Sequence, residues 1–196
     1  TEIIPEDVPL MQRQPAIKFA AMNILKFKTG RETETEQFLA LMRILASMDV
    51  VVFSEVAATR DEHHKQNEVF CQLLSDFSSN GAKFTCVSST PSRVYSNGEA
   101  TGQPEVHVVF ARDPIKIMAH RTWEGSADGD DLVTFDHAPL TVLLEDPRFD
   151  ESCNQIVLTS VHLPPGSSKR VNARDRQLNA MIKGYPAESG TRLGQA

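Results

Sequence analysis

The sequence predicts an α/β (α+β) protein in which a mixed β-sheet is flanked by helices. Strand patterns at 17–25 and 49–56 enclose a helical pattern, so the chain opens strand–helix–strand. The unbroken apolar run at 50–53 indicates a strand buried on both faces. Most of the later patterns, from residue 83 onward, are strands. This order is typical of a mixed sheet covered by helices.

The elements of the first half follow from helix caps, breakers and apolar spacing. Thr33 or Thr35 can cap the first helix, and Asn80-Gly81 ends the second. In chain order we predict an irregular leader over 1–16, a strand over 17–25, a loop over 26–32, a helix to about Ser47, a strand over 49–56 and a helix from Asp61.

The second half is richer in strands and in loop residues. Ser, Pro, Gly and Asn make 89–104 a long loop, and aspartates make 124–131 an acidic loop. The predicted strands are 83–88, 105–112, 115–121, 140–144 and 155–162. Ser167 or Ser168 can cap a helix that ends near Lys183, so one domain spans 17–183 and a tail spans 184–196.

Composition limits the classes of function. The 196 residues suffice for one domain with a sizeable core, and the net charge of −6 excludes nucleic-acid binding through overall basic character. Three widely spaced cysteines favour an intracellular, reducing setting. The alternative is a single disulfide between two of them. The sequence shows neither an apolar signal core nor a membrane-spanning run.

Two polar residues end the first two predicted strands. Asn23 follows one apolar strand and Glu55 follows the next. Because a helical crossover makes such strands parallel neighbours, both side chains should lie at one edge of the sheet. A carboxylate beside an amide suits a hard cation such as Mg²⁺. The alternative interpretation is a helix cap or a solvated strand end.

Three further residues stand at strand ends. Glu105 opens a strand, His162 ends one, and His137 precedes another. His162 suits a proton donor or a hydrogen-bond donor to phosphate, and His137 can reach the same edge. The alternatives are a solvated carboxylate, a structural histidine and a turn residue, respectively.

Five short motifs occur in an order that resembles the endonuclease/exonuclease/phosphatase superfamily, the fold of pancreatic-type deoxyribonuclease, and the resemblance covers roughly residues 17–183. They are Lys18-Phe-Ala-Ala-Met-Asn23-Ile24, Asp49-Val-Val-Val-Phe-Ser-Glu55-Val56, Glu105-Val-His-Val-Val-Phe-Ala-Arg112, His137-Ala-Pro139 and Val161-His162-Leu-Pro-Pro165.

The resemblance implies half of a four-layer α/β sandwich, with this chain supplying one of its two sheets. It implies Mg²⁺- or Mn²⁺-dependent hydrolysis of a phosphate ester, by a nuclease, phosphodiesterase or phosphatase. Glu55 would bind the metal, while Asn23, Glu105 and His162 would be catalytic. Phosphate or substrate binding would fall to His137 and Arg112. In this scheme Glu105 supports another histidine.

The sequence also departs from the family pattern. Ala57 and His137 stand where deoxyribonucleases often carry arginines, and the chain holds no Gly-Asp-Phe-Asn-like or Ser-Asp-His motif. We therefore expect the isolated chain to be inactive. The alternative is a degenerate, non-catalytic subunit, in which a protein partner or second segment covers an exposed sheet face. An unrelated α/β domain is the third interpretation.

Overall fold

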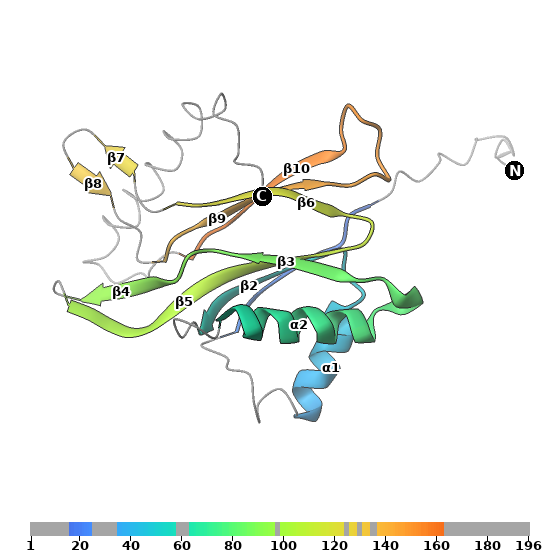
Figure 1. Cartoon of the computed structure of the whole chain (residues 1–196), viewed down its shortest axis with the longest axis horizontal. Helices are drawn as coiled ribbons and strands as arrows, with labels where there is room; N and C mark the ends of the chain where they lie inside the picture. The colour runs from blue at the N-terminus through green and yellow to red at the C-terminus, as the bar shows by residue number, and fades with distance from the viewer. Residues whose placement is uncertain are drawn as a thin grey trace, which may run out of the picture.

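The computed structural model describes residues 16–24, 35–57, 63–96, 99–123, 126–128, 131–133 and 137–162. The predicted C-terminal helix and tail therefore lie outside the described residues, as does most of the leader. Two packed sheets and two helices form the body of the described part (Figure 1). The α/β class with a mixed sheet is confirmed. No helix in the described ranges is long and apolar enough to cross a membrane.

The chain opens strand–helix–strand as predicted. Strand β1 (Phe19–Asn23) pairs in parallel with β2 (Val50–Ala57), and helix α1 (Glu36–Leu45) connects them. Thr35 caps α1, because its Oγ1 accepts a 3.2 Å hydrogen bond from the Phe38 amide. The crossover therefore brings the carboxyl ends of β1 and β2 to the same edge.

A long strand organises the rest of this sheet, which we call sheet A. Strand β5 (Glu99–Arg112) pairs antiparallel with β2, with β3 (Phe84–Ser88) and with β4 (Ser92–Ser96). The prediction of a loop over 89–104 is thus wrong for most of its length. The residue composition of this segment is typical of a loop, but pairing between β4 and the start of β5 holds it in a strand conformation.

The later strands form a second sheet, sheet B. It contains β6 (Lys116–Thr122), β9 (Leu140–Glu145) and β10 (Gln155–Ser160), all antiparallel. The expectation that the chain supplies only one sheet is therefore wrong, because it contributes strands to both. The predicted acidic loop 124–131 also contains strand pairing, between β7 (Ser126–Asp128) and β8 (Asp131–Val133).

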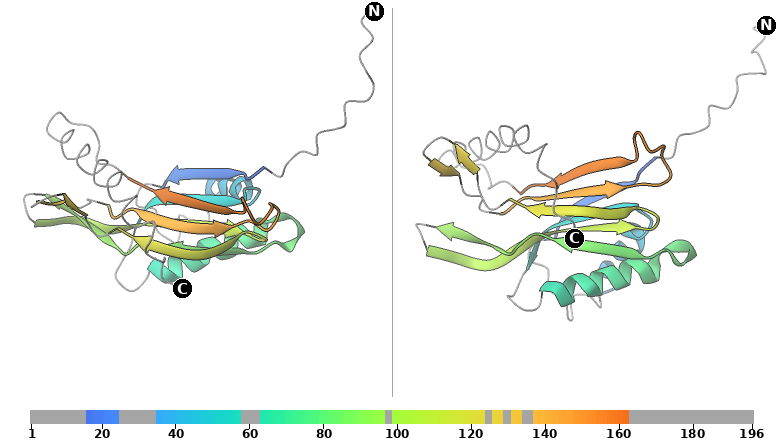
Figure 2. Two further views of the ribbon diagram at one scale, coloured as in Figure 1. Left: turned by 90° about the horizontal axis from the view of Figure 1, so that it is seen from above. Right: turned by 45° about the horizontal axis from the view of Figure 1, so that its top comes forward.

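Sheet A is covered on both faces. Helix α2 (His63–Phe77) lies beside α1 on one face, and sheet B lies on the other (Figures 1 and 2). Residues of β5 alternate between the two cores: Val108 and Phe110 face the helices, whereas Val109 and Ala111 face sheet B. By the same alternation Glu105 and His107 belong to the side of β5 that faces sheet B.

Candidate active site

The polar ends of β1 and β2 meet as predicted. Asn23 lies opposite Ser54 in the parallel register, and its Nδ2 donates a 2.6 Å hydrogen bond to Oε1 of Glu55. The contact joins residues that are 32 positions apart in the sequence. The amide thus fixes the position of the carboxylate at the edge of sheet A.

A backbone irregularity directs Glu55 towards sheet B. The pairing of β2 with β5 shifts register between Phe53 and Val56, and Glu55 has a φ of 57°. Val51 and Phe53 face the helices, so regular alternation would send Glu55 the same way. The bulge gives that place to Val56 and frees Glu55 for the opposite face. The left-handed backbone conformation at Glu55 therefore places its carboxylate in the candidate site and is not needed for core packing.

This strain is measurable. A side chain in the left-handed region costs about 1–2 kcal/mol, and glycine avoids that cost. Since Glu55→Gly and Glu55→Ala both remove the carboxylate, we expect the glycine variant to be more stable than the alanine variant by about 1 kcal/mol. Urea unfolding of the two variants measures this difference. Equal stabilities, or a more stable alanine variant, would show that the bulge is not strained.

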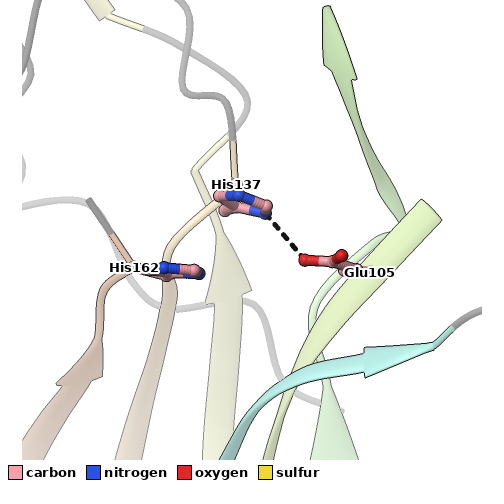
Figure 3. Close-up of side chains that lie close together, drawn as sticks. All are labelled: Glu105, His137 and His162. Carbon is pink, nitrogen blue, oxygen red and sulfur yellow. Dashed lines mark ion pairs between the residues drawn. The ribbon is translucent and has the colours of Figure 1, made fainter. Parts of the chain in front are cut away.

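Two histidines complete the cluster from the side of sheet B. His162 follows β10, and its Nε2 lies 3.1 Å from Oε1 of Glu55. His137 precedes β9, and its Nδ1 lies 3.4 Å from Oε2 of Glu105 (Figure 3). The two imidazole rings stack, with centroids 4.5 Å apart and planes 15° apart. The site therefore spans both sheets, with a carboxylate beside each histidine.

All four side chains are largely removed from water. Glu105 is only 4% exposed and His137 12%, while Glu55 and His162 are 11% and 23% exposed. Their charges interact across a medium less polar than water, which strengthens both attraction and repulsion. The slightly greater exposure of His162 makes it the histidine that a ligand reaches most readily.

A third histidine, His107, lies near His137 and His162 and was not indicated by the sequence patterns. It is 2% exposed, and its Nδ1 lies 2.8 Å from Oγ of Ser160, the last residue of β10. Burial, followed by the nearby His137 and His162, lowers the pKa of His107 to about 4. Because His107 is two residues from Glu105 on the same strand, both side chains point to the same face of the sheet. The apolar residues on either side of His107 are instead typical of a core strand.

The lowered pKa of His107 predicts a pH dependence of stability. The unfolded chain, with a pKa near 6.5, takes up this proton before the folded chain does. Stability is therefore lost as pH falls from 6.5 towards 4, by about 2 kcal/mol from this group between pH 7.5 and pH 5. We expect His107→Gln to lose about 2 kcal/mol less than the wild type over that interval in urea unfolding. Equal losses in both proteins would contradict the prediction.

The structure does not bring Arg112 to the cluster. This residue ends β5, seven positions beyond Glu105, which corresponds to about 23 Å along an extended strand. Its Nη2 donates a 3.2 Å hydrogen bond to Oγ of Ser79, next to α2. Asn23, Glu55, Glu105, His137 and His162 are therefore brought together, whereas Arg112 lies at the other end of the sheet.

The donor set at Asn23 and Glu55 fits a hard cation. Among the described residues, the contacts of Glu55 from Asn23 and His162 both fall on Oε1. Oε2 is therefore the carboxylate oxygen that can coordinate an ion. Mg²⁺ commonly uses one or two carboxylates and keeps several waters. A carboxylate and an amide are ligand types that would suit such an ion, and waters or substrate would have to supply its remaining ligands.

Comparison with known proteins finds similar folds among solved structures but no match by sequence. No protein-family model and no curated protein matches the sequence. Solved structures do match, beginning with an endonuclease/exonuclease/phosphatase family protein from Leptotrichia buccalis. At 15% identity and a TM-score of 0.53, the match covers 84% of this chain and 62% of that one. The fold is that of the endonuclease/exonuclease/phosphatase proteins.

Two further structures share this endonuclease/exonuclease/phosphatase fold. The catalytic domain of human Nocturnin, solved with a bound sulfate anion, is 17% identical with a TM-score of 0.55, covering 88% of this chain and 60% of that one. ANGEL2, a 2′,3′-cyclic phosphatase, is 15% identical with a TM-score of 0.50, covering 84% and 42%. The chain therefore spans less than two thirds of the length of each of these proteins.

Proposed function

We propose that this chain carries part of the active site of a Mg²⁺- or Mn²⁺-dependent phosphoric-ester hydrolase. The observation that supports this most is the continuous contact from Asn23 through Glu55 to His162. It joins a cation-binding carboxylate to an imidazole across two sheets. Hydrolases of phosphate esters use this fold, which adds support from the comparison.

Each residue has a role that its position permits. Glu55, steadied by Asn23, holds the cation, which when bound neutralises negative charge on the phosphate. His162 donates a hydrogen bond or a proton to a phosphate oxygen, and the carboxylate of Glu55 orients its ring. Glu105 orients His137, which contacts the substrate phosphate from the adjacent stacked position.

The substrate class is a phosphate ester, with nucleic acid as one member of that class. The human Nocturnin structure holds a sulfate, an anion shaped like phosphate, and ANGEL2 is a cyclic phosphatase. The net charge of −6 weighs against high-affinity binding along duplex DNA, because such binding depends on neutralising many phosphates.

A non-catalytic, interacting subunit is the second candidate. On the described part of sheet B, Met118 of β6 and Val157 of β10 are 42% and 52% exposed. Exposed apolar side chains on a sheet favour contact with another segment or protein. This candidate predicts a stable complex and no hydrolysis, with or without Mg²⁺.

A substrate panel separates the two candidates. We would assay the longest natural protein that carries this sequence, and the 196-residue chain itself, against phosphomonoesters, phosphodiesters, DNA and RNA. We expect Mg²⁺-dependent turnover by the natural protein and none by the 196-residue chain. Turnover by the isolated chain would refute its predicted inactivity, and no turnover by either protein would favour the subunit.

A further inference from the structure

A second group of potential metal ligands lies beside the Asn23–Glu55 pair. Glu105, His137 and His162 each offer a ligand atom, and these atoms all lie within 4.8 Å of one another (Figure 3). Oε2 of Glu105 and Nδ1 of His137 are 3.4 Å apart. Neighbouring ligands of tetrahedral Zn²⁺, with bonds near 2.0–2.1 Å, are separated by about 3.4 Å. This pair therefore already has the spacing that such an ion requires.

His162 provides a buried lone pair. Its Nε2 faces Oε1 of Glu55 at 3.1 Å, which favours the tautomer that donates from Nε2. Its Nδ1 is buried and has no hydrogen-bond partner among the residues that the structure describes. An unsatisfied buried acceptor is energetically unfavourable, and coordination of a cation would satisfy it.

The surroundings of His162 match those of a metal-binding histidine. Such a histidine usually donates its second ring N–H to a carboxylate, which fixes the ring and raises its basicity. Glu55 occupies that position, and the Nδ2 group of Asn23 holds Glu55 at 2.6 Å. The contacts from Asn23 to Glu55 and from Glu55 to His162 would thus orient the His162 ring for an ion bound at its Nδ1.

Binding requires one adjustment. The two imidazoles are stacked with planes 15° apart, so their in-plane lone pairs do not converge on one point. One ring has to tilt out of the stack. Rotation about χ2 of histidine has a broad, shallow energy profile. The tilt is therefore a local side-chain movement.

We propose that Glu105, His137 and His162 bind a transition-metal ion of the Zn²⁺ class, with Glu55 as the outer partner of His162. Two imidazoles and one carboxylate suit this class, whereas Mg²⁺ prefers oxygen ligands. The bound ion inhibits phosphate-ester hydrolysis, because it occupies His162. The inhibition rests on the proposed function, but the binding does not.

Binding of the metal alone tests the site. The 196-residue chain is titrated with Zn²⁺ by calorimetry, and with Co²⁺ by visible absorption, in excess Mg²⁺. We expect one ion per chain and a four-coordinate Co²⁺ spectrum. His137→Ala and Glu105→Gln should each weaken binding more than about 100-fold, and Glu55→Gln should weaken it about 10-fold. His120→Ala, which removes an exposed histidine of β6, should leave binding unchanged.

The outcomes are distinct. Amide NMR spectra identify variants that keep the fold, and a folded His137→Ala or Glu105→Gln chain with wild-type Zn²⁺ affinity would overturn the site. Binding without inhibition of a Mg²⁺-dependent reaction would overturn the regulatory role alone. Absence of any Mg²⁺-dependent reaction would defeat the proposed function, whereas one Zn²⁺ per chain, lost in the folded variants, would still support the metal site.

Discussion

Replacing His162 by alanine is expected to lower phosphate-ester hydrolysis by about 10²–10⁴-fold, the usual loss when a proton-transferring group is removed. The imidazole lies 3.1 Å from Glu55, the proposed cation ligand, and is partly exposed. It can therefore contact a phosphate oxygen next to the cation. The measurement is kcat/KM of the longest natural protein that carries this sequence, with Mg²⁺ saturating.

Two companion variants make this prediction specific. Glu55→Gln keeps the shape of the side chain but removes the charge that holds the cation, so activity should fall and the Mg²⁺ requirement should rise. His120→Ala removes an exposed histidine of β6 and should change kcat/KM little. A His162→Ala protein that is as active as His120→Ala would exclude His162 from the reaction.

Replacing Arg148 by methionine is expected to destabilise the protein by about 3 kcal/mol. Asp146 is fully buried, and Arg148 binds its carboxylate through Nε and Nη2, at distances down to 2.7 Å. Arg148 also reaches Oδ1 of Asp49 at 3.3 Å, and Oδ2 of Asp49 accepts a hydrogen bond from the Lys18 amide. Without the guanidinium, Asp146 keeps a buried and poorly compensated charge.

A double variant separates this cause from lost packing. Asp146→Asn in the Arg148→Met background removes the stranded charge, so it should recover part of the lost stability. Both variants are compared with the wild type by urea unfolding near neutral pH. If Arg148→Met unfolds at the wild-type urea concentration, the arginine does not compensate the buried aspartate.

The meeting of Asn23 and Glu55 could be predicted because it follows from local rules. An apolar strand, a capped helix and a second apolar strand form a crossover between parallel strands, which places both carboxyl ends at one edge. The actual capping by Thr35 and the end of α2 before Asn80-Gly81 follow equally local signals. These elements are defined within a few residues of the chain.

The features that were missed depend on distant pairing. The division into two sheets is decided by where β6 and β9 pair, and composition does not encode this. Residues 92–96 and 99–103 are extended, despite their Ser and Gly content, because β4 and β5 pair with each other. The bulge at Glu55 has no sequence signal, because a glutamate is unusual at positive φ. His107 is hidden in an apolar strand and gains its partner, Ser160, only through the packing of the two sheets.

A Mg²⁺ titration of the 196-residue chain, followed by backbone amide NMR, tests most directly whether this edge of the fold is a cation site. We expect saturable shifts at Asn23 and Glu55 that disappear in Glu55→Gln. The shifts should persist in Glu145→Gln. Glu145 lies on β9, and its carboxylate pairs with Lys116. If Glu55→Gln titrates like the wild type, or no saturable shift occurs at Asn23 and Glu55, the site does not bind the cation on which the proposed hydrolysis depends.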